Sequence, residues 1–452
     1  MSIPDIDKLL GMEVYATKTQ GVGGAIKASV EDFMVEEVLV DGSKAQINPS
    51  APQKTVLGCT QEPQRYLLCV LVKRNWDNFI AVKNVARQLG IDQNRIQIAG
   101  IKDAKAATAQ YITIENVLME DAAKVDGAGI TVRPVGYVRN PLSLFYLLGN
   151  GFTITVTGIN QEERFIKEQV EAAMQEICQA GGMPNFFGHQ RFGTIRPITH
   201  LVGKALLKGN LEEAAMIFLA QPSPHEHPES RQARAELEES RDFSLALEHF
   251  PKQLRYERLM LHYLTEKPSD FAGAFRTLPG KLQVLFVQAY QSYLFNRFLS
   301  ERLKAALPLG EALVGDFVVG MERTGLPLVN MPRYVTEESL AKTNEAVAAG
   351  KLRVALPLVG FKQKLSKGVM GELESQVLAE EGVDLWGFGA TVNSKLGGRG
   401  GLRTATTPVN NFQLLNATSS SISLGFTLYR GSYATVLLRE IMKPSNPIAA
   451  GF

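Results

Sequence analysis

One acidic side chain, Asp103, stands in a short polar stretch between two apolar runs. The stretch reaches from Ala99 to Tyr111 and places Lys102 and Lys105 on either side of the acid. A carboxylate of this kind is ionised at neutral pH, and a nearby cation keeps it ionised even where water is partly excluded. It can then act as a nucleophile or as a general base. Taken alone, the same stretch also fits a charged hairpin loop with no chemical role.

Other residue patterns narrow the chemistry. Glu31, Glu36 and Glu37 could supply a second carboxylate, so a two-carboxylate glycosidase or nucleoside hydrolase stays open. The sequence contains no phosphate-binding Walker motif, no serine-hydrolase elbow and no H-E-x-x-H zinc motif. We therefore predict neither ATP-driven nor serine-hydrolase chemistry, and no metal site.

A dense group of aromatic and amide side chains suggests nucleic acid. The segment is Pro184-Asn185-Phe186-Phe187-Gly188-His189-Gln190-Arg191-Phe192-Gly193. Its glycines would disrupt a regular core element, although any single phenylalanine is more often a core residue. Aromatic rings beside amide and cationic groups suit unstacked bases, because rings stack on bases and amides read their edges.

Composition describes an ordinary globular chain. Of 452 residues, 48 are Lys or Arg and 46 are Asp or Glu, which excludes a polybasic binder but leaves room for a basic cleft. Three cysteines without a C-x-x-C pair indicate a reducing, cytoplasmic environment. The sequence has no apolar run of eighteen residues and no basic-then-apolar leader, so we expect no membrane span and no signal peptide.

The order of elements predicts an α/β (α+β) fold with a mixed sheet. Strands are expected near residues 29–40, 66–72, 96–101, 111–114, 130–138 and 145–156, and helices near 77–89, 117–125 and 161–180. Residues 198–208, 211–219, 229–240, 245–264 and 281–303 read as helices. Shorter β-like pieces fill 310–360, a helix ends near 381, and residues 395–403 read as a flexible basic link. A last strand and helix cover 422–439, so the first domain is predicted to be discontinuous.

Five segments, in order, resemble motifs of the TruD family of tRNA pseudouridine synthases. They are Lys27-x-x-x-Glu31-Asp32-Phe33-x-Val35-x-Glu37, Gly100-x-Lys102-Asp103-x-x-Ala106-x-Thr108-x-Gln110, Gly149-Asn150-x-Phe152, the aromatic segment 184–193, and Gly431-Ser432-Tyr433-Ala434-Thr435 with Arg439-Glu440. The resemblance spans about residues 27–443. Departures are small: Val30 replaces a frequent proline, and Tyr433 replaces a phenylalanine of some members. The length resembles archaeal or eukaryotic members.

The resemblance implies conversion of uridine to pseudouridine in tRNA, at uridine 13, without cofactor or metal. It implies Asp103 as the catalytic carboxylate, by a nucleophilic or a glycal route. Lys27 would hold Asp103 ionised, and Phe33, Asn150, Phe152 and Tyr433 would line the pocket for the flipped base. The family's catalytic domain, a largely antiparallel mixed sheet with flanking helices, would comprise 1–190 plus 405–452. A helix-rich inserted domain, 190–405, would grip the RNA.

Two alternatives remain open on the sequence. A non-catalytic RNA-binding protein of the same fold would bind tRNA without changing it. A hydrolase would release free base or sugar. The oligomeric state stays open, and a monomer is compatible with the sequence.

Overall fold

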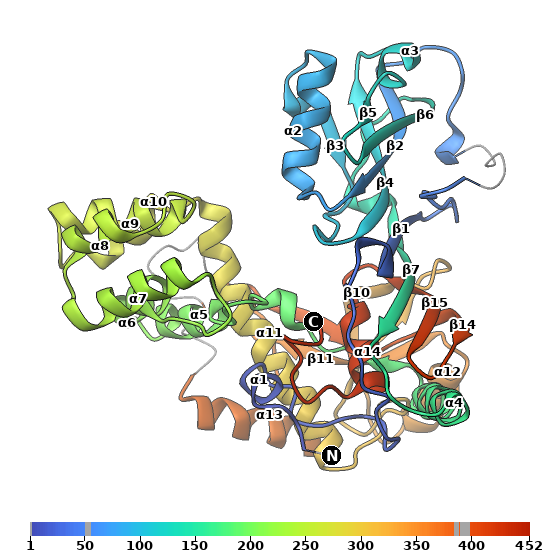
Figure 1. The fold of residues 1–452 in the computed structure, drawn as a ribbon. Coiled ribbons are helices and arrows are strands. Elements are labelled where there is room, and N and C mark those ends of the chain that lie inside the picture. The colour runs from blue at the N-terminus through green and yellow to red at the C-terminus, as the bar shows by residue number, and fades with distance from the viewer. Residues whose placement is uncertain (1, 50–55, 384–387, 389–397) are drawn as a thin grey trace.

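A computed structural model describes residues 2–49, 56–383, 388 and 398–452 (Figure 1). The strands of its main sheet are β1 (Phe33–Leu39), β2 (Tyr66–Arg74), β3 (Ile96–Ile98), β4 (Ala107–Glu115), β5 (Asp126–Gly127), β6 (Ile130–Val138), β7 (Leu147–Thr157), β14 (Asn410–Ala417) and β15 (Ser421–Tyr429). The remaining described strands are β8 (Met183–Pro184), β9 (Phe317–Met321), β10 (Pro327–Tyr334), β11 (Leu352–Leu358), β12 (Gly401–Thr404) and β13 (Thr406–Thr407).

Helices cover the sheet and fill the middle of the chain. They are α1 (Asp5–Leu9), α2 (Asn78–Leu89), α3 (Met119–Ala122), α4 (Glu163–Gln179), α5 (Thr199–Leu207), α6 (Leu211–Ala220), α7 (Pro228–Ser240), α8 (Phe243–His249), α9 (Arg255–Glu266), α10 (Phe271–Thr277), α11 (Gly280–Lys304), α12 (Leu340–Ala348), α13 (Gly368–Glu381) and α14 (Ala434–Met442). In the part of the chain that is described, no helix has the length and apolar character needed to cross a membrane.

The main sheet has the order β14-β15-β7-β1-β4-β2-β6-β5, with β3 paired to β4. The β1–β4 pair is parallel, and the other described pairs are antiparallel. The fold-class prediction of a mixed, largely antiparallel sheet with flanking helices is therefore confirmed. Side chains of β1, β7 and β15 form one core with α4 and α14, and those of β2, β4 and β6 form another with α2.

Local signals explain the best-predicted elements. β1 buries every second residue, with Phe33, Val35 and Glu37 on the covered face, as its alternation predicts. Asp77 caps α2 by accepting from two backbone amides, and Gly90 ends the helix in the left-handed conformation.

Several predicted bounds were wrong. Residues 245–264 form two helices, α8 and α9, because Pro251 interrupts the run between them. The strand expected at 96–101 ends at Ile98, and Ile101 is exposed. α10, α12 and β14 were not predicted.

The prediction of a flexible basic link was also wrong at its C-terminal end. Of the expected flexible link 395–403, residues 395–397 lie outside the described residues. Its end is part of strand β12, which pairs with β11. The Arg403 side chain makes contacts with Asn185 and Gly431 instead of facing water.

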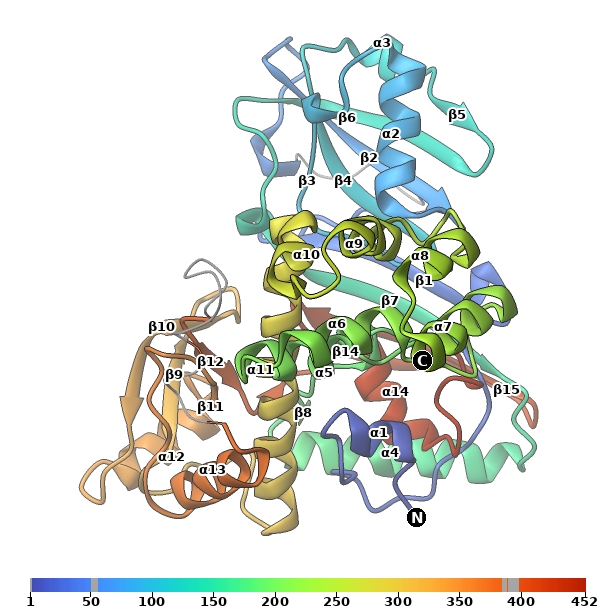
Figure 2. The same cartoon turned by 90° about the vertical axis from the view of Figure 1, so that its left-hand side faces the viewer.

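The middle of the chain builds a helical layer and a second sheet beside the main one (Figure 2). α5–α10 pack around a core of their own to which α11 contributes Phe286. The order of the second sheet is β10-β9-β11-β12, and α12 and α13 lie beside it. The long helix α11 passes between these parts, and its buried side chains join a core with Phe186, Phe192 and Val436.

Candidate active site

The loop before β4 carries Asp103 and is fixed by two buried lysines. Lys73 Nζ, on β2, donates hydrogen bonds to the backbone oxygens of Asp103 (2.5 Å) and Trp76 (2.9 Å). Lys102 Nζ pairs with Glu37 Oε1 at 2.6 Å, and both side chains are almost completely buried. The other Glu37 oxygen accepts the Tyr111 N–H at 2.8 Å. Lys102 therefore fastens the loop to β1 and does not flank Asp103 in water.

The carboxylate itself meets an amide and a cation from distant segments. Gln190 Nε2 donates a hydrogen bond to Asp103 Oδ1. Lys27 Nζ lies 3.9 Å from the same oxygen and 4.6 Å from the centroid of the Phe33 ring. The Asp103 side chain keeps 24% of its surface exposed, so it remains open to a reactant.

Burial lowers the pKa values of the two lysines next to this loop, Lys27 and Lys73. It lowers the pKa of Lys27, while the Asp103 charge opposes that shift. It lowers the pKa of Lys73 to about 8, again against the pull of Asp103. The negative charge of Asp103 therefore stabilises the charged form of both lysines.

A cavity of about 270 Å³ opens beside Asp103. It is lined by residues from β1, β7, the Asp103 loop, Gln190 and the start of α14, among them Phe33, Asn150, Phe152 and Tyr433. Every residue predicted for the site except Lys27 lines this cavity. Lys27 contacts it through Asp103 and Phe33.

The aromatic wall of the cavity belongs partly to the core. Phe152 stacks on Phe426 at 5.3 Å between centroids and meets the Phe33 ring edge-on at 6.3 Å. Phe33 and Phe152 are only 2% and 8% exposed. Both rings therefore belong to the hydrophobic core and also line the cavity. Their rigid packing presents an apolar surface of fixed shape.

Two buried oxygens in the cavity wall have unused hydrogen-bonding capacity. Within the described residues, Asn150 Oδ1 and Thr435 Oγ1 have no hydrogen-bond partner. Both residues line the cavity. Buried polar atoms are nearly always satisfied, so these two mark places where a ligand can bind. A Cβ at Gly188 would lie 2.9 Å from Thr435 Oγ1, which explains the glycine there.

Gln190, Thr435 and Arg403 were not predicted as site residues. The first two lie inside the quoted motifs, which could have identified them. Arg403 had no such signal, because its contacts are distant in sequence. It stacks 4.1 Å from the centroid of Phe187 and donates to Asn185 Oδ1 (2.6 Å) and to the Gly431 backbone oxygen (2.8 Å). It thereby supports the turn that carries Tyr433.

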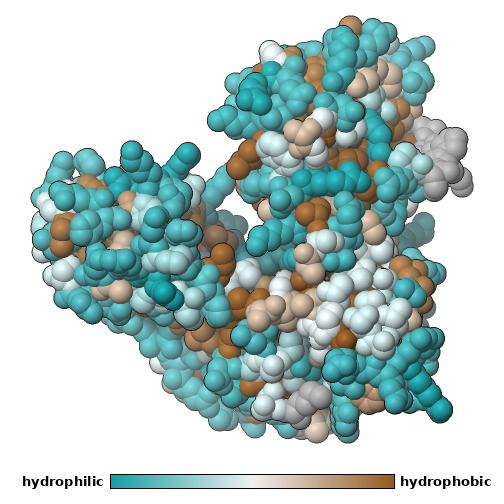
Figure 3. Space-filling view, viewed as in Figure 1, coloured by the Kyte–Doolittle hydropathy of each residue, from teal (hydrophilic) through white to brown (hydrophobic). Residues whose placement is uncertain are grey.

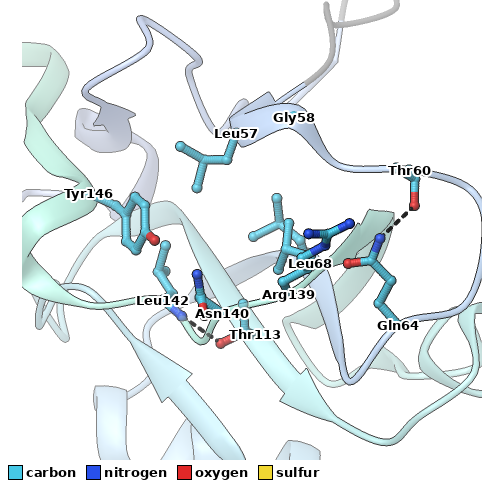
Figure 4. Close-up of a pocket in the computed structure, with 11 residues that line it drawn as sticks. Leu57, Gly58, Thr60, Gln64, Leu68, Thr113, Arg139, Asn140, Leu142 and Tyr146 are labelled. Carbon is cyan, nitrogen blue, oxygen red and sulfur yellow. Dashed lines mark hydrogen bonds between the residues drawn. The ribbon is translucent and has the colours of Figure 1, made fainter.

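A second cavity, of about 330 Å³, contains none of the predicted residues (Figure 4). Leu57, Gln64, Arg139, Asn140 and Tyr146 are among the residues around it. Among the described residues that line it there is no carboxylate, so these residues offer no counterpart to Asp103.

The comparisons with known proteins identify the family. The profile described as "tRNA pseudouridine synthase D (TruD)" matches residues 9–441. A Methanococcoides burtonii protein named "Probable tRNA pseudouridine synthase D" is 36% identical over 449 residues, 98% of each chain. A Thermococcus sibiricus protein of the same name is 38% identical, covering 95% of this chain and 97% of that protein.

A solved structure agrees with these sequence matches. The crystal structure of the Methanosarcina mazei TruD protein superposes with a TM-score of 0.83 at 36% identity, over 99% of this chain and all of that one. The resemblance seen in the five motifs is thereby confirmed over the full length, and the chain belongs to the TruD family of tRNA pseudouridine synthases, which are isomerases.

Proposed function

We propose that this chain isomerises uridine to pseudouridine at position 13 of tRNA, with Asp103 as the catalytic carboxylate. The observation that carries the proposal is the cavity in which Asp103 meets an apolar ring wall and two unpartnered polar oxygens. A flipped uracil needs this combination, because its ring faces are apolar and its edges carry N–H and carbonyl groups.

Each residue around the cavity has a separate role in this proposal. The uracil ring lies against Phe152 and Phe33, and Asn150 Oδ1 accepts a hydrogen bond from a ring N–H. Asp103 then either attacks C1′, forming an ester as the N1–C1′ bond breaks, or removes the 2′ hydrogen as a proton while the same bond breaks and leaves a glycal. The base turns within the cavity and C5 bonds to C1′; in the first route the ester bond from Asp103 to C1′ breaks at this step, and in the second Asp103 returns the proton to C2′. The C5 hydrogen leaves as a proton, and N1 takes up a proton. Lys27 places a positive charge beside the carboxylate, and Gln190 holds it in a fixed orientation.

The substrate proposal includes the helix-rich middle of the chain. We propose residues 190–405 as an inserted domain that holds the folded tRNA, with 1–190 and 405–452 as the catalytic domain. The separate core of α5–α10 supports this division, because a layer with its own core can form a surface away from the cavity. The tRNA substrate and the target position rest on the family resemblance.

The first prediction tests Asp103 directly. Asp103→Asn is expected to lower tritium release from C5-labelled uridine in tRNA by about 10³-fold or more, because the amide cannot act as nucleophile or base. Filter binding of tRNA should stay near the wild-type level. A variant that turns over normally but binds poorly would contradict the catalytic role.

Carbodiimide mapping of the treated tRNA locates the product. Pseudouridine at position 13 is the expected result, and a different position would correct the substrate. Bound but unmodified tRNA would favour the non-catalytic RNA-binding protein. Free uracil on chromatography would favour a hydrolase.

A further inference from the structure

Large apolar side chains are exposed to solvent at the mouth of the Asp103 cavity. Ile101 and Leu144 both line the cavity and are 65% and 58% exposed. Phe145, the next residue after Leu144, is 84% exposed. Single exposed apolar residues need no explanation, but a group at the rim of a binding cavity marks a contact surface. Apolar side chains are also visible along the hollow between the helical layer and the sheet (Figure 3).

The turn that carries Leu144 and Phe145 is held firmly. It is a short 3-10 helix, η4 (Leu144–Tyr146), just before β7. Arg430 Nη1 donates hydrogen bonds to the backbone oxygens of Leu144 (2.6 Å) and Leu147 (3.0 Å). The Val40 N–H donates to the Tyr146 oxygen at 2.9 Å. The exposed tip is therefore a fixed projection on a rigid base.

The opposite side of the same turn is anchored in the second cavity. Tyr146 lines that cavity, and the Leu142 N–H donates to Thr113 Oγ1 at 3.0 Å, as Figure 4 shows. Tyr146 and Leu142 thus contact the rest of the protein. Leu144 and Phe145 are exposed to solvent, and Leu144 also lines the Asp103 cavity.

One exposed cation lies in a loop that lines the Asp103 cavity. Lys105, in the Asp103 loop, has an exposed side chain. Apolar side chains and an exposed cation around one cavity suit a strand of nucleic acid, whose bases stack on apolar surfaces and whose phosphates attract cations.

We infer that Leu144 and Phe145 form an apolar wedge that fills the gap left in the RNA stack when the target uridine enters the cavity. The inference rests on the proposed function. The wedge would contact the two bases that flank the target uridine. Flipping a base costs its stacking energy, and an apolar side chain in the vacated space restores part of the contact.

The test compares Phe145→Ser with wild type on two RNAs. One is a folded tRNA transcript, and the other is a short single-stranded RNA with the same target and neighbours. On folded tRNA we expect kcat to fall about tenfold or more, since a stacking contact of this size is lost. The single-stranded RNA, whose target is already unstacked, should lose much less.

Controls separate the wedge from other causes. Leu415→Ser removes another exposed apolar side chain (51% exposed) from β14 and should leave both activities unchanged. Phe145→Leu keeps an apolar tip and should recover most of the rate. A 2-aminopurine beside the target should report less unstacking with Phe145→Ser than with wild type.

The outcomes are distinguishable. Wild-type rates for Phe145→Ser on folded tRNA would overturn the wedge while leaving the proposed function intact. An equal loss on both RNAs would also overturn it, because a wedge matters only where a stack must open. Absence of pseudouridine with the wild-type protein would overturn the proposed function and the wedge with it.

Discussion

At the scale of single residues, the carboxylate of Asp103 depends on a partner that exists only in the folded chain. Gln190 comes from the aromatic segment 87 residues away and donates to the same oxygen that Lys27 faces. A carboxylate with two oxygens can rotate, and a reactant must meet one oxygen at a fixed angle. Gln190 is therefore a positioning residue for Asp103.

Gln190→Leu tests that role. Loss of a hydrogen bond to a charged group costs about 1.5–3 kcal/mol, so kcat should fall by roughly 10- to 150-fold. KM for tRNA and the melting temperature should change little, because Gln190 is exposed. Single-turnover and steady-state kinetics measure the split. A rise in KM with kcat unchanged would instead make Gln190 an RNA-binding residue.

At this scale the sequence predicts residues that the structure brings to one cavity, but it does not predict the contacts that hold them there. Motifs identified Asp103, Asn150 and Tyr433 because chemistry restricts those residue types, and all three line one cavity. Lys102 was read as a neighbour of Asp103 because adjacent charges suggest a pair. Its true partner, Glu37, lies 65 residues away, and only the β1–β4 pairing brings them together.

At the scale of elements, the Lys102–Glu37 ion pair connects the Asp103 loop to the sheet. Glu37 occupies the inward face of β1, Lys102 comes from the loop before β4, and Tyr111 of β4 donates to the same carboxylate. A buried pair with good geometry adds little net stability, but removing one partner leaves an uncompensated buried charge.

Lys102→Met should therefore destabilise the protein by about 3–5 kcal/mol. The double variant with Glu37→Gln should recover part of that loss, because the glutamine is neutral and still accepts the Tyr111 N–H. Urea denaturation of the four proteins gives the coupling energy. Additive losses would show that the two side chains act independently.

Elements with a strong pattern were predictable, and those defined by long-range pairing were not. β1 and α2 carry alternation and capping signals in their own residues. β12 begins with glycine and follows a glycine-rich run, so its local composition indicates a flexible link. Pairing with β11 and the hydrogen bonds of Arg403 to Asn185 and Gly431 give it a regular structure, and propensity alone does not reveal those contacts.

At the scale of the whole molecule, distant parts of the chain share cores and ion pairs. Asp7 in α1 accepts hydrogen bonds from Arg439 Nε in α14 (2.5 Å) and lies 2.8 Å from His189 Nε2. These three buried groups join the N-terminal arm, the aromatic segment and the last helix. The core around α11 likewise includes side chains from both ends of the chain. The site is therefore coupled to the packing of the middle region.

The pH dependence of stability provides a test in that middle region. Glu374 in α13 is fully buried, and burial raises its pKa to about 8, although hydrogen bonds from Ser366 N (2.7 Å) and Oγ (2.8 Å) oppose the shift. The ordinary pKa of a glutamate, as in the unfolded chain, is 4.5. Between these values the folded state binds more protons, so unfolding becomes easier as pH rises from about 5 to 8.

Glu374→Gln should remove this slope, since a glutamine accepts from Ser366 N and can donate to its hydroxyl without titrating. Between pH 5.5 and 8, wild type should lose about 1–3 kcal/mol more stability than the variant, as each pKa unit corresponds to about 1.4 kcal/mol.

Glu372→Gln, exposed on the same helix, is the matched control and should follow wild type. Denaturation at both pH values measures the difference, and parallel slopes for wild type and Glu374→Gln would mean that Glu374 is ionised throughout. Because α13 packs on α11 in the core that also contains Phe186 and Phe192, a titration there should also alter hydrogen exchange at these two residues.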